Sequence, residues 1–248
     1  MKFVKETILN DIKLNALLSI DKEDIKNGVL RIPEGVQMIK ENACQNFLDI
    51  KKVIIPATVQ IISDYAFYDN RFLKEVVFEG ESELVIIGAH AFEKNISLEK
   101  ISLPKNVKYL SEKTFAVTGL KEIELNEGLK HLGKSCFSGT KFLEKIVIPS
   151  TLEVIPERCF FMSGLMTLEC KEGLKEIKES AFASCPTLYN VSLPQSLKKI
   201  YGRAFADSNI NAIEIYKSTK CNKNAFENCE IPYTFERTPR KIEDEENE

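Results

Sequence analysis

The chain lacks the features that mark membrane-spanning and exported proteins. Its 248 residues contain no tryptophan. They also contain no run of about 18 consecutive apolar residues, so we expect no transmembrane helix. A secretory leader needs an uninterrupted apolar stretch of roughly 7–15 residues, and charges such as Glu6, Asp11 and Lys13 break the N-terminal segment. These absences predict a cytoplasmic protein, with secretion by a leaderless route as the alternative.

An excess of one charge sign is also missing. The chain has 34 basic and 37 acidic residues, a net charge of −3, and five of the acids lie within 243–248. A nucleic-acid-binding domain needs a basic patch or stripe, and the body of this chain is close to electrically balanced. We therefore expect no nucleic-acid partner.

Few residues have the chemistry for catalysis or metal binding. The two histidines, His90 and His131, lack cysteine or carboxylate partners at metal-ligand spacing, and we expect both at the surface. The seven cysteines are odd in number and form no CxxC pair, which indicates reduced thiols. The chain contains no phosphate-binding glycine loop and no GxSxG motif. The sequence therefore predicts no metal, no cofactor and no enzymatic activity.

What the chain has in place of these motifs is a repeat. A small residue followed by phenylalanine recurs at intervals of 21 to 25 residues, and Cys44 holds the phenylalanine position in the first copy. The column consists of Phe67, Phe92, Phe115, Phe137, Phe160, Phe182, Phe205 and Phe226. Such a regular interval is the sequence signature of a repeat architecture.

Other columns appear once the copies are aligned on that phenylalanine. Aliphatic residues stand five and eight positions earlier, and each copy begins with two apolar residues that flank one other residue, such as Val53/Ile55. This alternation predicts a short strand with one buried face, and the proline that follows it in five copies ends the strand. We expect the segment around the phenylalanine to return as a short helical or 3₁₀ turn. Three residues after it comes a small polar column, expected to bond the backbone of the turn: Asn70, Asn95, Thr118, Thr140, Ser163, Cys185, Ser208 and Cys229.

One copy is too small to bury its own apolar face, so the copies are expected to stack. The columns predict a solenoid of about nine coils, roughly 40–45 Å long at the usual strand spacing of about 4.8 Å. The seven cysteines fall into apolar or small-residue columns, where a free cysteine behaves as a small hydrophobe. We expect the short strands to form one parallel sheet along one face.

The repeat resembles a known family. The copies at 143–160 and 188–205 fit the pattern L-x-x-I-x-L-P-x-x-L-x-x-I-x-x-x-A-F, which resembles the leucine-rich repeats of the BspA-like family. The resemblance covers roughly 29–231 and implies an α/β fold, a right-handed β/α superhelix with a parallel sheet on the concave face. It also implies an adhesion or protein-recognition scaffold, as members are often bacterial surface proteins.

The flanks of the repeat differ from its body. Residues 1–28 carry apolar residues at nearly helical spacing, which predicts a partly helical cap over one end of the core. Residues 232–248 are acidic, and we interpret them as a disordered, solubilising tail. Their resemblance to the glutamate-rich C-termini of type IV secretion effectors leaves a secretion signal as the alternative.

The strands also suggest a binding surface. The column just before each strand alternates Lys52, Glu75, Lys100, Glu122 and Lys145, a pattern that favours cross-strand pairing. The following copies are less charged there and carry the composition of recognition surfaces, which makes these residues the candidate partner-binding site: Met166, Thr167, Tyr189, Asn190 and Asn211, with Ala212 beside them. Drift in repeat composition is the alternative.

The function that these features favour is a monomeric, non-enzymatic scaffold that recognises a protein partner. Two alternatives stay open. One is a secreted bacterial effector that uses the same solenoid to bind a host protein, and the other is a cell-surface adhesin.

Overall fold

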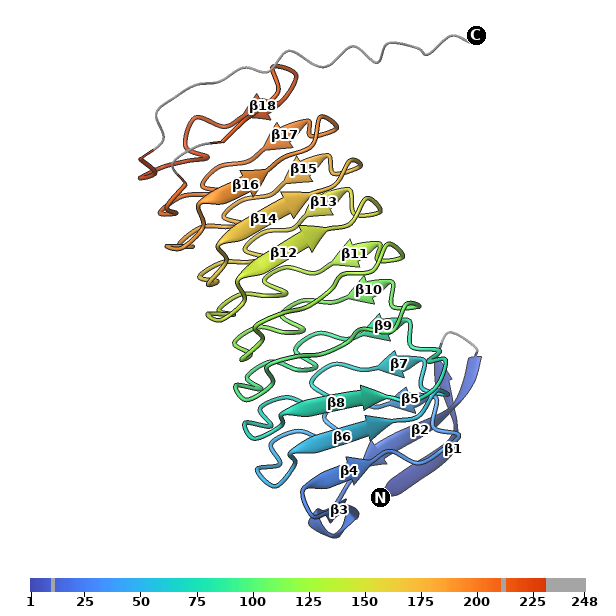
Figure 1. Cartoon of the computed structure of the whole chain (residues 1–248). Coiled ribbons are helices and arrows are strands. Elements are labelled where there is room, and N and C mark those ends of the chain that lie inside the picture. The colour runs from blue at the N-terminus through green and yellow to red at the C-terminus, as the bar shows by residue number, and fades with distance from the viewer. Residues whose placement is uncertain (10–11, 211–212, 231–248) are drawn as a thin grey trace, which may run out of the picture.

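The computed structural model describes residues 1–9, 12–210 and 213–230, and shows an elongated stack of coils (Figure 1). Each coil contributes a strand to one or both of two rows. The first row contains β4 (Val29–Arg31), β6 (Lys52–Ile55), β8 (Glu75–Phe78), β12 (Lys145–Ile148), β14 (Thr167–Cys170) and β16 (Asn190–Ser192). The second row contains nine strands of two residues, one per coil: β5 (Met38–Ile39), β7 (Ile61–Ile62), β9 (Ile86–Ile87), β10 (Tyr109–Leu110), β11 (His131–Leu132), β13 (Val154–Ile155), β15 (Glu176–Ile177), β17 (Lys199–Ile200) and β18 (Lys220–Cys221).

The strands of consecutive coils pair in parallel and in matching register. Lys52 pairs with Glu75 and Val53 with Val76, and the same positions pair between β12 and β14. In β6, β12 and β14 of the first row two alternate side chains point inward, such as Val53 and Ile55. In most strands of the second row one side chain does, so Ile62 and Ile155 are fully buried while their neighbours are only partly so. The fold is therefore a parallel β-solenoid of about nine coils, as the columns predict.

The first row is not the single continuous sheet that the sequence analysis predicts. β8 is the last strand of a sheet that begins with β3 (Ile25–Lys26) and continues through β4 and β6, and β12 is the first strand of the sheet β12-β14-β16. Between β8 and β12, residues 100–103 and 122–125 share one isolated bridge, Lys100↔Glu122. The second row, absent from that prediction, runs beside this gap without interruption, from β2 (Ile12–Ser19) through β11.

The return segments are turns, and their prediction as helical or 3₁₀ segments is wrong. In coil after coil the residues two before and two after the phenylalanine have φ between +50° and +71°, as at Tyr65 and Val117. A helix cannot continue through such residues. Successive amides alternate between partners, since the Phe67 N–H donates to the Ala91 carbonyl of the next coil (2.9 Å) and the Tyr68 N–H to Tyr65 in its own coil (3.1 Å). The turns thus bond one coil to the next, and the α/β superhelix implied by the resemblance is in this chain almost entirely β.

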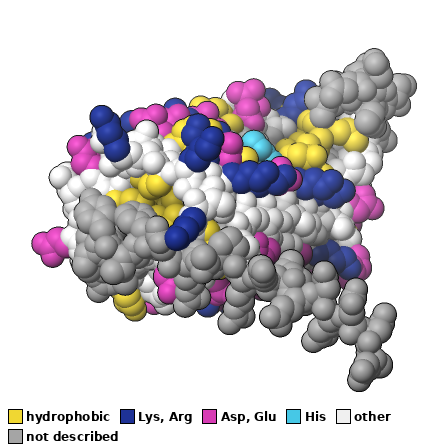
Figure 2. Space-filling model, turned by 90° about the horizontal axis from the view of Figure 1, so that it is seen from above, with side chains coloured by type: hydrophobic (Ala, Val, Ile, Leu, Met, Phe, Trp, Pro, Cys, Tyr) yellow, Lys and Arg dark blue, Asp and Glu magenta, His cyan; other side chains and the backbone are white. Residues whose placement is uncertain are grey.

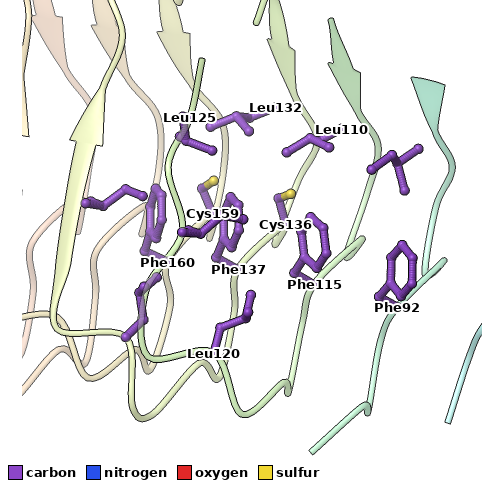
Figure 3. Close-up of a cluster of buried hydrophobic side chains, with 14 of the residues drawn as sticks. Phe92, Leu110, Phe115, Leu120, Leu125, Leu132, Cys136, Phe137, Cys159 and Phe160 are labelled. Atoms are coloured by element: carbon purple, nitrogen blue, oxygen red, sulfur yellow. The ribbon is translucent and has the colours of Figure 1, made fainter. Parts of the chain in front are cut away.

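Eight phenylalanines stack along the interior. Their rings form seven consecutive near-parallel pairs, with centroids 5.1–5.6 Å apart and interplanar angles of at most 13°. Figure 3 shows four of these rings, from Phe92 to Phe160, with leucines and the thiols of Cys136 and Cys159 packed around them. The predicted inward direction of the column is confirmed, because Phe115 and Phe182 are both 0% exposed.

The N-terminal segment is built from strands. β1 (Lys2–Leu9) and β2 (Ile12–Ser19) form an antiparallel hairpin, followed by a single 3₁₀ turn η1 (Lys22–Asp24) and by β3 (Ile25–Lys26). The prediction of a partly helical cap is thus wrong except for η1. A strand fits this end because β2 pairs in parallel with the edge of β5, which satisfies backbone groups that a helix leaves open. Leu17 of β2 is buried in the main core. The predicted acidic tail, 232–248, lies outside the described residues.

Candidate functional site

The residues of the predicted binding patch lie side by side on the first row. Thr167 of β14 pairs with Asn190 of β16, and the Met166 carbonyl accepts hydrogen bonds from the amides of Tyr189 (3.3 Å) and Asn190 (3.1 Å). Tyr189 is 47% exposed and Met166 is partly buried. Asn211 lies outside the described residues. The structure brings four members of the patch together, and their role in binding stays a prediction.

The small polar column is structural. Asn95 Nδ2 donates to the carbonyls of Phe67 (2.9 Å) and Phe92 (2.7 Å), and Thr118 and Thr140 bond their own phenylalanine carbonyls in the same way. Toward the C-terminus, Ser208 donates to the carbonyl of Phe182 (2.8 Å) in the preceding coil. These contacts confirm the predicted role of the column.

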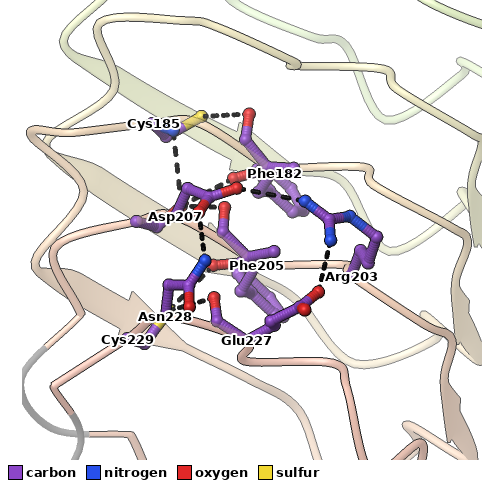
Figure 4. A network of polar contacts seen from close by, with 11 residues as sticks. Phe182, Cys185, Arg203, Phe205, Asp207, Glu227, Asn228 and Cys229 are labelled. Atoms are coloured by element: carbon purple, nitrogen blue, oxygen red, sulfur yellow. Dashed lines mark hydrogen bonds and ion pairs between the residues drawn. The ribbon is translucent and has the colours of Figure 1, made fainter.

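The last coils are further joined by a surface network. The Arg203 guanidinium binds Glu227 and, at 3.2 Å, Asp207, whose other oxygen accepts a bond from Asn228 (2.8 Å) (Figure 4). The residues in this network come from neighbouring turns. The charged groups of this network therefore bind one another and join the last turns, which is a structural role.

Five of the seven cysteines fill core positions, as their columns predict, whereas Cys221 is exposed and Cys229 only partly buried, because both lie in the last coil. All seven are free: Cys44, Cys136, Cys159, Cys170, Cys185, Cys221 and Cys229. Burial raises the pKa of Cys136 to about 12 and that of Cys185 to about 11. A thiol with so high a pKa is a poor nucleophile at neutral pH.

These pKa values predict a loss of stability at alkaline pH. Unfolded thiols ionise from about pH 8.5 upward while the buried ones stay protonated, so the unfolded state binds fewer protons and the free energy of unfolding falls as pH rises. We expect the urea midpoint to decrease between pH 8.5 and pH 10. A Cys136→Ala, Cys159→Ala double variant should show a shallower decrease of the urea midpoint with pH. An equal decrease in both proteins would contradict the attribution of this pH dependence to the buried thiols.

The two histidines differ. His131 is exposed on β11, as expected. His90 is only partly exposed: its ring stacks on Tyr65, with centroids 4.4 Å apart, and its Nδ1 contacts Glu93. The prediction of a surface position is incomplete for His90, because a turn residue with φ +57° directs its ring onto the preceding coil. Among the described residues, no cluster of histidine, cysteine and carboxylate side chains fits a metal ion.

Many exposed charges are paired with opposite charges. The predicted cross-strand pairs Lys52–Glu75 (2.9 Å) and Lys100–Glu122 (2.5 Å) are present, while Lys145 binds Glu169 (3.5 Å). On the face seen from above, basic and acidic side chains are interspersed (Figure 2). Exposed pairs of this kind contribute little to stability, about 0–1 kcal/mol each.

A row of exposed apolar side chains is the feature that the sequence analysis missed. We call it the apolar edge; it has one residue in each of six successive coils: Leu48, Phe72, Ile96, Val117, Phe142 and Met162, 44–60% exposed. All six follow the phenylalanine column, or Cys44 in the first copy, by two to five positions, in the turn that leads to the first row. At about 4.8 Å per coil the row extends over roughly 25 Å. The sequence signal that could have revealed this row is the recurrence of a bulky apolar residue shortly after the phenylalanine position in these six copies.

Solved structures of similar fold are bacterial repeat proteins. A leucine-rich repeat protein from Bacteroides ovatus matches with a TM-score of 0.76 at 23% identity, over 91% of this chain and 61% of its own length. A T. pallidum leucine-rich repeat protein matches with a TM-score of 0.55 at 19% identity, over 73% of this chain and 76% of that one. The pneumococcal vaccine antigen PcpA matches with a TM-score of 0.52 at 18% identity, over 93% and 78%. At these identities the likeness shows the fold alone.

The sequence comparisons specify the family. No curated protein matches the chain significantly. Within the described residues no helix is long and apolar enough to cross a membrane. The model of the BspA type leucine-rich repeat region matches six copies, over residues 37–165 and 114–232. Because these matches span most of the chain, the protein belongs to the family of BspA-type leucine-rich repeats.

Proposed function

We propose that this chain is a non-enzymatic scaffold that recognises a protein partner through the apolar edge. The observation that carries the proposal is the placement of one exposed apolar side chain in each of six successive coils. Single exposed apolar residues are normal, but their recurrence in the turns of six successive coils favours a surface where another protein binds. The family, a class of repeat scaffolds, supports the same function.

The chemistry of the described residues supports a binding role over catalysis. The buried thiols have raised pKa values, and His90 is held by Tyr65 and Glu93. General acid–base or nucleophilic catalysis needs a nucleophile beside a positioned base, and the described residues place no histidine beside a thiol.

A double variant, Phe72→Ser with Phe142→Ser, tests the apolar edge. These two side chains are 51% and 60% exposed, so their replacement should leave the fold intact. Aromatic residues at the centre of an interface contribute about 2 kcal/mol or more each, so we expect binding to weaken at least about tenfold. The measurement is affinity capture from a cell lysate with the wild-type chain as bait, followed by titration of the purified captured protein against each variant.

Two further variants make the result specific. Tyr109→Ser removes an aromatic residue that is 40% exposed on β10, outside the apolar edge, and should bind as the wild type does. A Met166→Ala, Tyr189→Ala variant tests the predicted patch on β14 and β16. If the patch variant loses binding while the apolar-edge variant keeps it, the partner binds at the patch and the proposal for the apolar edge fails.

A further inference from the structure

The gap in the first row, formed by residues 100–103 and 122–125 between β8 and β12, leaves backbone hydrogen-bonding groups unpaired in the middle of the solenoid. Elsewhere in this row neighbouring strands pair over three or four residues, as β12 and β14 do from Lys145↔Thr167 to Ile148↔Cys170. In the gap, within the described part of the chain, the backbone of 101–103 makes no hydrogen bond to β8 and that of 123–125 makes none to β12, while the two segments are joined to each other at the bridge Lys100↔Glu122. The first-row edge of β12 facing the gap is unpaired as well.

The core beneath the gap is nevertheless continuous. Ile101 is 2% exposed, Ile123 9% and Leu125 7%, while Leu103 is partly buried, so the inward side chains still belong to the core. These four side chains also line the gap on its inner side. An unpaired edge of this kind is a template for pairing with another extended chain.

A groove lies over this gap. Its volume is about 980 Å³, and its walls come from 100–105, from 121–126 and from the first residues of β12, with Glu169 and Lys171 at one end. Pockets that bind ligands have volumes of about 300–1,000 Å³, so this groove is at the upper end of that range. The apolar atoms of Leu103 and Val147 contribute to the walls between charged residues.

The charges in the walls favour a cationic occupant. All five lysines of the groove are bound by carboxylates: Lys100 by Glu122, Lys105 by Glu81, Lys121 by Glu99, Lys145 by Glu169 and Lys171 by Glu127. Two exposed carboxylates of the walls, Glu124 and Glu144, have no ion pair among the described residues. The net unpaired charge of the groove is therefore negative.

We propose that this groove binds an extended basic peptide segment of a partner protein by strand addition. The open amides and carbonyls of the gap pair with the peptide backbone, and Glu124 and Glu144 bind its lysine or arginine side chains. In strand addition the affinity comes from main-chain hydrogen bonds and the specificity from contacts of alternate side chains of the peptide. The gap provides unpaired backbone groups for the first, and Glu124 and Glu144 provide contacts for the second.

The inference deepens the proposed recognition function but uses a groove whose walls contain no residue of the apolar edge. The two proposals can therefore fail separately. A groove variant that binds the peptide as the wild type does counts against the groove alone, and an apolar-edge variant that binds the captured partner as the wild type does counts against the apolar edge alone.

The test uses a fluorescent peptide of alternating valine and lysine, titrated with the full chain and followed by anisotropy. We expect saturable binding to the wild type. A Glu124→Gln, Glu144→Gln variant should bind about five- to tenfold more weakly, as expected for the loss of two exposed charge pairs. The matched control, Glu34→Gln with Glu41→Gln, removes two exposed carboxylates outside the groove and should bind as the wild type does.

Two further peptides separate strand addition from simple charge attraction. A peptide with alternate backbone amides N-methylated keeps its charge but loses half of its donors, and we expect it to bind at least about tenfold more weakly. A valine–glutamate peptide should not bind. The proposal is overturned if the valine–lysine peptide shows no saturable binding, if the N-methylated peptide binds equally well, or if both glutamine variants match the wild type.

Discussion

Replacing Phe137 with alanine is expected to lower the free energy of unfolding by about 3–5 kcal/mol. The ring is 0% exposed and stacks between Phe115, at 5.6 Å, and Phe160, at 5.2 Å. Its truncation removes both stacking contacts and leaves a cavity. Neighbouring coils cannot close that cavity, because their spacing is set by hydrogen bonds from coil to coil. Urea denaturation followed by circular dichroism measures the loss.

The matched control for this prediction is Phe142→Ala. That phenylalanine lies five residues further along the same coil but is 60% exposed, so its replacement should change stability by no more than about 0.5 kcal/mol. Equal losses in the two variants, or a loss below about 1 kcal/mol at Phe137, would show that the ring stack does not stabilise the solenoid as inferred.

The second large effect is expected at Asn70, whose replacement with alanine should cost about 2–4 kcal/mol. Its side chain is 0% exposed and makes three hydrogen bonds. The amide donates to the carbonyls of Cys44 (2.8 Å) and Phe67 (3.1 Å), and Oδ1 accepts a bond from the Phe47 amide (2.7 Å). The variant leaves the Phe47 amide and the Cys44 carbonyl without their side-chain partner in the first coils, and thermal or urea unfolding reports the cost.

Asn95 offers an internal comparison in the same column. It makes the two equivalent donations, but its Oδ1 is buried without a hydrogen-bond partner. Removing that oxygen relieves a desolvated acceptor, so Asn95→Ala should cost less than Asn70→Ala, about 1–2 kcal/mol. Asn95→Thr should recover part of this loss by bonding Phe92 as Thr118 bonds Phe115. An Asn95→Ala variant less stable than Asn70→Ala would contradict this account.

The column pattern predicted much of the interior correctly. Phe115 and Phe182 point inward, Thr118 and Thr140 bond the turn carbonyls, and the five buried thiols fill small or apolar positions. Each of these outcomes depends only on a residue recurring at the same place in successive coils. A side chain buried in one coil has the same neighbours in the next, so the repeat interval is sufficient to predict its direction.

The errors concern the backbone. The turns were expected to be helical because no residue type in the columns signals a positive φ. Tyr65 and Val117 adopt it because their amides bond the next coil. For similar reasons, nearly helical spacing in residues 1–28 did not reveal a hairpin whose second strand pairs with β5.

Of the two candidate sites, one was predicted from the sequence and the other was found only in the structure. The patch around Tyr189 was predicted from a change in composition along one column, and the structure places its described residues together. The apolar edge was missed because its members occupy slightly different turn positions, from two residues after the phenylalanine at Val117 to five after it at Phe142. Only the folded turns bring them to one side.

The amino-acid sequence by itself determined the number of coils, the buried columns and the inward ladder of rings, because apolar residues repeated at one interval must share an interior. The tertiary structure alone decided where the first row of strands opens, how the turns are bonded and which apolar side chains of the turns stay exposed. These features depend on hydrogen bonds and register between coils, and the side chains of a single repeat do not specify the position of the next backbone.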